Sequence, residues 1–394
     1  MTGAPAEAEA MTGVGAALEQ LRRAGLLREL RTLESGPGAR VRLDGREVLL
    51  LCSNDYLGLA GHPAVRAAAA EAAQRWGAGA GASRLVSGNL ALHDRLEAEL
   101  AAFKGTEACV LFGSGYLANT GVIAALAGRD EVILSDERNH ASIVDGCRLS
   151  RARTVVYDHA DLDALAAALH RTGRRRTLIV TDAVFSMDGD LAPLEGIAEL
   201  ARRHGARILV DEAHATGVVG PGGRGLVAEL GLEGQIDVVV GTLGKALGSY
   251  GAFAACTRQM AAFLLNRART AIFSTALPPP ATGAALEALR LVRDEPALLE
   301  GLHANARTLR DALAAQGFPI TAASPTMPIV PLVVGDPHAA MGLCEAALAG
   351  GVFAQAIRPP TVPPGTSRLR LVATAAHEPA DLRAAAATLA AARR

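Results

Sequence analysis

Short apolar runs recur through the middle of the chain, and helical patterns separate most of them. Between residues 108 and 256 the runs are ACVLF, EVILS, RTVVY, TLIVT, ARILV, IDVVV and GAFAAC. The intervening stretches, such as 89–103, place apolar residues at the i, i+3, i+4 spacing of an amphipathic helix. Apolar strands without polar alternation are buried on both faces. The pattern therefore predicts an α/β domain with a mainly parallel seven-stranded central sheet.

The pattern changes towards both ends of the chain. Residues 1–12 are small and are expected to form a disordered tail, followed by a short helix over about 14–34. RVRLDGREVLLL then reads as two strands joined by an Asp-Gly turn. After FSTALPPP (273–280) come two long Ala/Leu helices, a strand-containing segment and a last helix. We expect an N-terminal tail, helix and short strands over 1–48, a large domain over 49–287, and a smaller α/β domain over 288–394.

Composition narrows the class of protein. Half of the 394 residues are hydrophobic and only 3% are aromatic, so Ala, Leu and Val must build most of the core. The net charge of −1 predicts no general attraction to nucleic acid or an anionic membrane. Five scattered cysteines without a CxxC pair predict neither disulfides nor a zinc site. Because neither a signal peptide nor an apolar run of membrane-spanning length is evident, we expect a cytoplasmic protein.

The basic residues are almost all arginine. Of 39 lysines and arginines only Lys104 and Lys245 are lysine. Lys104 stands at a predicted helix end and fits a residue retained by chance. Lys245 follows the strand IDVVV in the glycine-rich stretch GTLGKALG. A desolvated lysine can lose a proton near neutral pH and attack a carbonyl, which arginine cannot do. Lys245 is therefore the candidate nucleophile.

Further motifs supply partners for this lysine. In FGSGYLAN (112–119) a strand runs through glycines into a helix start, where backbone N–H groups can bind a phosphate. Asp211 ends the strand ILVD, and His214 follows three residues later. Thr242 offers a hydroxyl, and His140 follows another strand end. A lysine able to form a Schiff base, a strand-end Asp and a phosphate-binding turn are what pyridoxal 5′-phosphate (PLP) needs.

Two other interpretations compete with this one. GSGYLA also fits the GxGxxA dinucleotide fingerprint, with Asp136 about 20 residues further on, so an NAD-dependent oxidoreductase stays open. The letters DEAH occur in nucleic-acid helicases, but Val239 and Ala246 occupy the positions at which a phosphate loop needs Gly and Ser or Thr. That excludes the helicase. Asp211 and His214 alone supply too few ligands for a metal.

The order of the motifs resembles the α-oxoamine synthases. SNDYLGL, SRLVSGN, FGSGYLAN, NHASIVDG, VFSMDGDLAPL, VDEAHATGVVG and TLGKALG follow one another, and the resemblance runs from about residue 15 to the end. It implies a PLP-dependent acyltransferase of fold type I that condenses an amino acid with an acyl thioester, carried on CoA or a carrier protein, and releases carbon dioxide. The stretch AIRPPTVPPGTSRLRLVATAAHE (356–378) resembles one branch of this family more than the others.

The resemblance also implies roles for individual residues. Lys245 would hold the cofactor and move the substrate proton, Asp211 would pair with the pyridine nitrogen, His214 would hydrogen-bond the phenolic oxygen, and His140 would stack on the ring. Contacts to the phosphate or ring would come from Ser114, Gly115, Tyr116, Ser186 and Thr242.

Other implied roles concern the substrates and a second subunit. Asn54 and Arg358 would bind the amino acid, and Arg28 would bind the acyl substrate. Ser274 and Thr275 would reach the phosphate of a neighbouring subunit, which implies a homodimer with shared active sites. Two positions depart from the family pattern: Asp182 replaces a common Glu, and Ala215 replaces a common Gly. The Asp182 carboxylate is left without a predicted contact.

Overall fold

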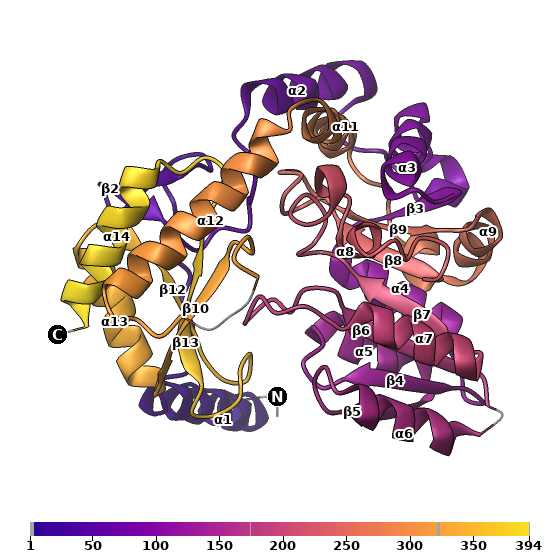
Figure 1. The fold of residues 1–394 in the computed structure, drawn as a ribbon, viewed down its shortest axis with the longest axis horizontal. Helices are drawn as coiled ribbons and strands as arrows, with labels where there is room; N and C mark the ends of the chain where they lie inside the picture. The colour runs from indigo at the N-terminus through magenta and orange to yellow at the C-terminus, as the bar shows by residue number, and fades with distance from the viewer. Residues whose placement is uncertain (1–3, 174, 321–323, 394) are drawn as a thin grey trace.

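The computed structural model describes residues 4–173, 175–320 and 324–393, and Figure 1 shows them arranged in two lobes. The larger lobe contains a seven-stranded sheet in the order β3-β9-β8-β7-β6-β4-β5. Its strands are β3 (Ala108–Phe112), β4 (Val132–Asp136), β5 (Arg153–Tyr157), β6 (Thr177–Asp182), β7 (Arg207–Asp211), β8 (Val238–Thr242) and β9 (Ala252–Cys256). These are the seven predicted apolar runs, so the predicted sheet is confirmed.

Most neighbouring strands of this sheet are parallel. β4 pairs in parallel with β5 and β6, β6 with β7, and β7 with β8, whereas β9 is antiparallel to both β3 and β8. The carboxyl ends of the parallel strands therefore meet at one edge. Asp136, Asp182, Asp211 and Thr242 are the last residues of four of these strands. In open α/β sheets this is the edge at which ligands bind.

Helices cover both faces of the sheet (Figure 1). Ile133 lies in one buried apolar cluster and the adjacent Leu134 in another, as expected for successive side chains that point to opposite faces of a strand. The burial of both faces explains why the strands are apolar without alternation. The helices are α2 (Pro63–Trp76), α3 (Ala91–Lys104), α4 (Gly115–Leu126), α5 (Ala141–Ser150), α6 (Leu162–Thr172), α7 (Leu194–His204), α8 (Leu226–Glu229), α9 (Arg258–Arg267), α10 (Arg269–Ile272) and α11 (Pro279–Asp294), with a π-helix (Arg84–Gly88) and a 3₁₀ helix (Pro221–Gly223).

The smaller lobe combines C-terminal and N-terminal segments. It contains α12 (Ala297–Ala315), β10 (Ile329–Gly335), α13 (Pro337–Ala349), β11 (Val352–Phe353), β12 (Gln355–Ile357), β13 (Ser367–Val372) and α14 (Pro379–Ala392). One sheet has the order β10-β13-β12, and another joins β1 (Arg40–Leu43) and β2 (Arg46–Leu50) to β11. The predicted Asp-Gly hairpin is confirmed, with Asp44 at φ 50° and Gly45 at φ 71°. The limits 1–48, 49–287 and 288–394 stay proposals, but the pairing of β2 with β11 attaches the N-terminal strands to the smaller lobe.

The N-terminal helix differs from its prediction. α1 spans Ala4–Arg23, so the expected disordered tail is wrong for residues 4–12, and residues 1–3 lie outside the described part. The Ala- and Glu-rich start favours a helix because these residues have high helix propensity. The helix also ends well before residue 34, just ahead of Gly25 at φ 66°. Within the described ranges, no helix combines the length and apolar character needed to cross a membrane.

Candidate active site

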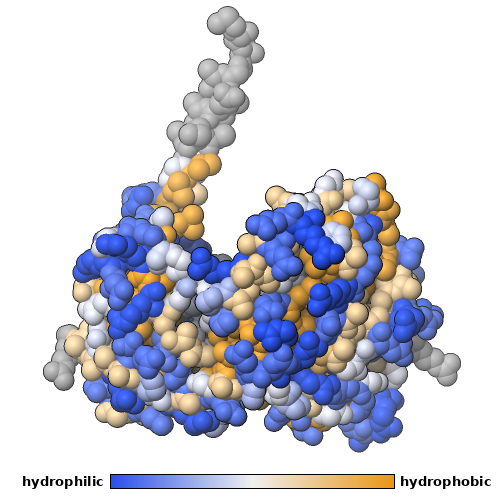
Figure 2. Space-filling view, turned by 90° about the horizontal axis from the view of Figure 1, so that it is seen from above, coloured by the Kyte–Doolittle hydropathy of each residue, from blue (hydrophilic) through white to orange (hydrophobic). Residues whose placement is uncertain are grey.

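A cavity of about 790 Å³ lies at the carboxyl edge of the parallel strands, against the smaller lobe. Figure 2 shows a depression in the surface between the two lobes. Among the residues that line the cavity are Asn54, His140, Ser186, His214, Lys245 and Arg370. His140, His214 and Lys245 follow β4, β7 and β8, while Arg370 belongs to β13. The fold thus brings together side chains from six separate parts of the sequence.

Lys245 belongs to a short chain of polar groups. Its Nζ lies 2.8 Å from Nε2 of His214, and Nδ1 of His214 lies 2.6 Å from the hydroxyl of Tyr56. Burial, and then the neighbouring Lys245, hold the pKa of His214 well below its usual value. Burial lowers the pKa of Lys245 to about 8, although Asp211 and Asp182 act in the opposite direction. About a tenth of the amine is therefore uncharged at pH 7, far more than for an ordinary lysine, and the uncharged form is the one that a nucleophile requires.

Asp211 is held as an oriented acceptor. Its carboxylate accepts hydrogen bonds from Asn119 Nδ2 at 2.6 Å and from the backbone N–H of Ala213 at 2.8 Å, and the residue is 4% exposed. Asn119 Nδ2 also lies 2.9 Å from Ser142 Oγ, while its Oδ1 is buried and has no hydrogen-bond partner among the described residues. Among the described residues, the side chain that donates to Asp211 is this neutral amide and not a cation, which leaves the charge of the carboxylate available to a ligand.

Asp182, whose contacts the sequence left open, lies beside Asp211 in the register of β6 and β7. Burial, and then the charge of Asp211, raise the pKa of Asp182 well above its ordinary value. The protonated form of Asp182 is therefore favoured. Its Oδ2 accepts the backbone N–H of His140 at 2.8 Å, so Asp182 fixes the position of that histidine.

His140 presents its ring to the cavity at the start of α5. Its Nδ1 accepts the backbone N–H of Ser142 at 3.2 Å and lies 2.7 Å from the Ser142 hydroxyl. Burial lowers the pKa of His140, with Asp211 opposing that change. A neutral, flat imidazole held at its backbone and at one ring nitrogen is suited to stacking against an aromatic ligand.

The turn between β3 and α4 has the geometry of an anion site. Ser114 caps α4 and accepts the N–H of Leu117 at 3.2 Å, and a Cβ built on Gly115 would meet no atom within 4 Å. The first backbone N–H groups of a helix lack intrahelical partners and attract phosphate. Tyr116 is exposed and hydrogen-bonds Asp145, while Thr242 Oγ1 accepts the N–H of Gly244 at 3.1 Å.

The remaining predicted cofactor contacts are placed differently. Ser186 lines the cavity, and its carbonyl accepts a hydrogen bond from Arg370. Ser274 and Thr275 do not belong to the cavity lining in the single chain; Thr275 instead pairs with Ser83 in an isolated bridge before α11. Their predicted contact with a second subunit therefore stays a prediction.

The donor set of this edge fits PLP. A lysine with a pKa near 8, a carboxylate supported by a neutral amide, a flat neutral histidine and an open helix N-terminus each match one part of that molecule. His214 can hydrogen-bond a ring oxygen next to Lys245 because both residues face the same cavity.

Three arginines that the sequence reasoning missed line the cavity: Arg138, Arg148 and Arg370. Arg370 is the one bonded to Asn54, another residue of the lining. Its guanidinium donates to Asn54 Oδ1 at 3.0 Å and to the Tyr56 hydroxyl at 3.2 Å. A signal was present in SRLRLV, where Arg368 and Arg370 recur with period two and alternate with leucines in a fully buried strand. Two arginines on one face of a buried strand require a polar surface opposite them.

Arg358 lies elsewhere, and its predicted role needs correction. It is 8% exposed and donates to the backbone carbonyls of Gly25 and Leu27, the latter at 3.2 Å. Arg28 donates to the Pro359 carbonyl at 3.3 Å. Both arginines therefore connect the segment after α1 to the loop after β12, and the structure does not bring Arg358 to the cavity of Lys245.

Two further interpretations change. Lys104 is not a residue retained by chance, because its ammonium forms a buried ion pair with Glu212 and donates to the Arg224 carbonyl. Asp136, the ribose ligand of the NAD hypothesis, is 2% exposed and accepts from His159 Nδ1 at 2.9 Å and from Ala160 N at 2.8 Å. Its oxygens are occupied within the protein, which removes the main support for dinucleotide binding.

Comparison with known proteins identifies the class. The sequence model described as "Aminotransferase class I and II" matches residues 46–389. Among solved structures, serine palmitoyltransferase "with PLP internal aldimine" superposes with a TM-score of 0.92 at 35% identity, covering 96% of each chain. The chain belongs to the aminotransferase class I and II family and has the fold of PLP-dependent enzymes of fold type I.

More similar relatives define its place within that family. Over 382 residues the chain is 54% identical to the 8-amino-7-oxononanoate synthase of Anaeromyxobacter dehalogenans (strain 2CP-1), covering 97% of this chain and 96% of the relative. The enzyme of the same name from Geobacter sulfurreducens is 53% identical, with 95% and 96% covered. A solved 8-amino-7-oxononanoate synthase from Francisella tularensis has a TM-score of 0.74 at 25% identity, with 87% and 97% covered. Within the family the chain is an α-oxoamine synthase, a PLP-dependent acyltransferase.

Proposed function

We propose that this chain condenses L-alanine with a pimeloyl thioester and releases carbon dioxide and the thiol, forming 8-amino-7-oxononanoate for biotin biosynthesis. The acyl carrier is either CoA or a carrier protein. The observation that carries the proposal is the cavity in which the Lys245 amine lies 2.8 Å from His214 while Arg370 and Asn54 line the same space. Relatives of that name, 50–54% identical over nearly the whole chain, support this choice of substrates.

The residues of the cavity divide the work. We assign Lys245 to hold the cofactor and to accept and return the proton on the α-carbon of the amino acid. Arg370 and Asn54 bind the amino-acid carboxylate, for which a guanidinium offers two parallel donors. Asp211 would hold a protonated ring nitrogen of PLP, and His140 would cover the ring. When bound, PLP supplies an electron sink for the carbon that loses its proton or its carboxylate.

The start of α4 would hold the phosphate of the cofactor in this proposal. The backbone N–H groups after Ser114, with Gly115, Tyr116 and Thr242, form its cradle. Ser274 and Thr275 complete the cradle of a partner subunit, so we propose a homodimer with shared sites. The five cysteines are all unpaired, which supports a cytoplasmic location.

Another α-oxoamine synthase activity is the second candidate, for instance glycine with acetyl-CoA. The similarity of the fold to serine palmitoyltransferase, with a TM-score of 0.92, shows that the same scaffold accepts other substrate pairs. Arg370 and Asn54 contact a group that all amino acids share, so these residues do not discriminate between the candidates.

A thiol-release assay decides between them. The purified holoenzyme is supplied with alanine, glycine or serine and with acetyl-, palmitoyl- or pimeloyl-CoA, each pair at equal concentrations. We expect alanine with pimeloyl-CoA to give the largest kcat/KM, and a Lys245→Ala variant to give none. Preference for glycine with acetyl-CoA, or for serine with palmitoyl-CoA, would replace the biotin assignment while leaving the family unchanged.

A further inference from the structure

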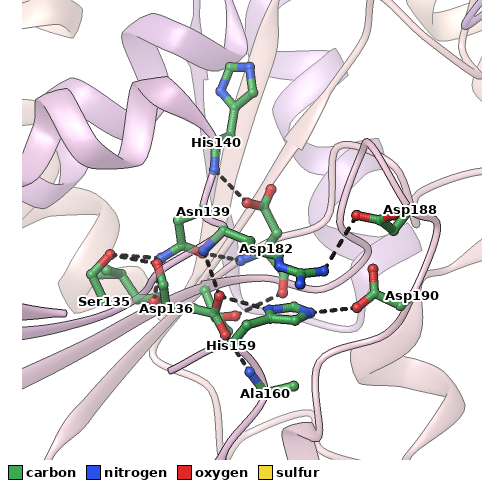
Figure 3. Close-up of polar contacts among 12 residues, drawn as sticks. Ser135, Asp136, Asn139, His140, His159, Ala160, Asp182, Asp188 and Asp190 are labelled. Atoms are coloured by element: carbon green, nitrogen blue, oxygen red, sulfur yellow. Dashed lines mark hydrogen bonds and ion pairs between the residues drawn. The ribbon is translucent and has the colours of Figure 1, made fainter. Parts of the chain in front are cut away.

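His159 lies between two carboxylates in the larger lobe, outside the part of the described chain that lines the cavity. Its Nδ1 is 2.9 Å from Asp136 Oδ1, and its Nε2 is 2.6 Å from Asp190 Oδ2 (Figure 3). The ring of Phe185 meets the imidazole edge to face, with centroids 4.3 Å apart. Because carboxylates accept hydrogen bonds, both ring nitrogens must donate to satisfy both contacts, which requires the imidazolium form.

The first carboxylate holds the loop that carries His140. Asp136 Oδ1 also accepts the backbone N–H of Arg138 at 2.9 Å, directly after β4. Asn139 then anchors the loop to β6, donating to the Val180 carbonyl at 2.8 Å. Figure 3 shows this series of contacts ending where the His140 N–H meets Asp182. The His159–Asp136 contact thus lies at the base of one wall of the cavity.

The second carboxylate holds the loop 185–190, which forms another wall. The Asp190 carbonyl accepts the N–H of Phe185 at 2.9 Å, and Gly189 donates to the Phe185 carbonyl at 2.8 Å, so the loop closes on itself. The carbonyl of Ser186, within this loop, accepts a hydrogen bond from Arg370. A displacement of Asp190 would therefore move the group against which the substrate arginine rests.

We propose that His159 is a positioning residue for amino-acid binding: through Asp136 and Asp190 it holds the loops of His140 and Ser186 at a fixed separation, and it thereby orients Arg370. The imidazolium of His159 connects two walls of the cavity, the loop that carries His140 and the loop 185–190, which are separate in sequence. The proposal rests on the proposed function in naming alanine as the amino acid and Arg370 as the ligand of its carboxylate. It assigns His159 no contact with substrate or cofactor.

The charge of His159 follows from its surroundings. Burial acts to lower its pKa, but the hydrogen bonds that His159 donates to Asp136 and Asp190 outweigh burial and raise the pKa to about 9. Within the described chain, the ionisable groups in contact with the ring are these two carboxylates, one from β4 and one from the loop 185–190. A folded-state pKa above the ordinary 6.5 means that the stabilisation is complete below about pH 6.5 and is lost as pH rises through about 9.

The test compares His159→Gln with His170→Gln, an exposed histidine on α6, in the PLP-loaded enzyme. Alanine affinity is measured without any thioester, from the change of cofactor absorbance on titration. We expect His159→Gln to raise the alanine Kd and KM about tenfold while kcat falls less than about threefold. The reason is that Arg370 is no longer held in the orientation that binds the amino acid. His170→Gln should change neither quantity. An unchanged Kd in a folded His159→Gln enzyme overturns the proposal.

Two further measurements keep the test decisive if that variant folds poorly. Asp190→Asn removes one carboxylate with little change of volume and should also raise the alanine Kd. Between pH 6.5 and 9, the thermal unfolding midpoint should fall further in the wild type than in Asp190→Asn, because the variant has less charge interaction to lose. A Kd for Asp190→Asn equal to the wild type, or identical pH profiles, contradicts the proposal. If alanine itself causes no absorbance change in the wild type, the proposed substrate fails, and the comparison is made with whichever of glycine and serine does.

Discussion

The amine of Lys245 lies 2.8 Å from Nε2 of His214, whose other ring nitrogen lies 2.6 Å from the Tyr56 hydroxyl. Burial keeps both members of this pair towards their uncharged forms, lowering the pKa of Lys245 to about 8 and that of His214 well below its usual value. An ammonium desolvated in this way destabilises the folded chain, so the arrangement that prepares the nucleophile has a cost in stability.

Lys245→Met should therefore stabilise the cofactor-free protein. The folded-state pKa of Lys245 is depressed from 10.5 to about 8, so the penalty is complete below pH 8 and disappears as pH approaches 10.5. Allowing for partial exposure, we expect a gain of about 2 kcal/mol in the free energy of unfolding at pH 7. Urea unfolding at pH 7 and 10 measures it. Lys245→Arg keeps the charge and should show no gain, although both variants should be inactive. Equal stability of Lys245→Met and wild type at pH 7 would contradict the depressed pKa.

Arg370→Lys and Arg358→Lys form a matched pair that locates the substrate carboxylate. Lysine keeps the charge but loses the two parallel donors, so Arg370→Lys should raise the KM for the amino acid by about 10- to 100-fold. Arg358→Lys should leave this KM within about twofold and lower the thermal midpoint, because it weakens the hydrogen bonds to Gly25 and Leu27. Steady-state kinetics with varied alanine give both values. The reverse result would restore Arg358 as the carboxylate ligand.

The neighbouring carboxylates Asp182 and Asp211 should respond differently to replacement by asparagine. Because burial and the charge of Asp211 raise the pKa of Asp182, its protonated form resembles asparagine, which can still accept the His140 N–H. Asp182→Asn should keep kcat within about fivefold, whereas Asp211→Asn should lower it by more than about 100-fold, because the acceptor that holds the charged ring nitrogen is lost. Turnover and cofactor absorbance of the two variants are compared directly. Similar losses in both would show that Asp182 works as an anion.

Lys104→Met should strongly destabilise the folded protein, although Lys104 does not line the cavity. The Lys104–Glu212 side chains are 2% and 0% exposed, and Glu212 Oε1 also accepts the N–H of Val227 at 2.7 Å. Removing the lysine leaves a buried, unpaired carboxylate, at a cost of about 3–5 kcal/mol. The double variant Lys104→Met/Glu212→Gln should recover part of this loss in thermal unfolding. No recovery in the double variant would mean that packing, rather than charge, accounts for the loss.

Shared active sites predict complementation between two inactive variants. Lys245→Ala lacks the nucleophile, and Ser274→Ala/Thr275→Ala should lack the contacts made to the partner. Subunits mixed at equal amounts and allowed to exchange should recover about a quarter of wild-type activity, because half of the dimers are mixed and each contains one intact site. Each variant incubated alone is the control. Sedimentation of a monomer, or recovery no greater than the sum of the controls, would rule out sharing.

Much of the fold could be read from the sequence because it depends on local patterns. All seven sheet strands were predicted, since burial on both faces leaves uninterrupted apolar runs such as ILV before Asp211. The Asp44-Gly45 hairpin was predictable for a similar reason, as its left-handed backbone favours those residues. The strand order β3-β9-β8-β7-β6-β4-β5 was not, because pairing between distant segments leaves no local mark.

The site residues likewise divide into those that the sequence indicated and those that only the structure revealed. The sequence by itself determined that Lys245, Asp211 and His214 are unusual, since a lone lysine among glycines and an Asp at a strand end have no simple structural purpose. Only the tertiary structure decided which of Arg358 and Arg370 lines the cavity: both lie in one motif-rich segment, but the loop after β12 and the strand β13 direct their guanidinium groups to different partners. It also decided that Lys104 is a buried ion pair and that His159 lies between two loops. These relationships join residues far apart in the chain, and desolvation and hydrogen bonding act on distances in space, which the linear order of residues does not contain.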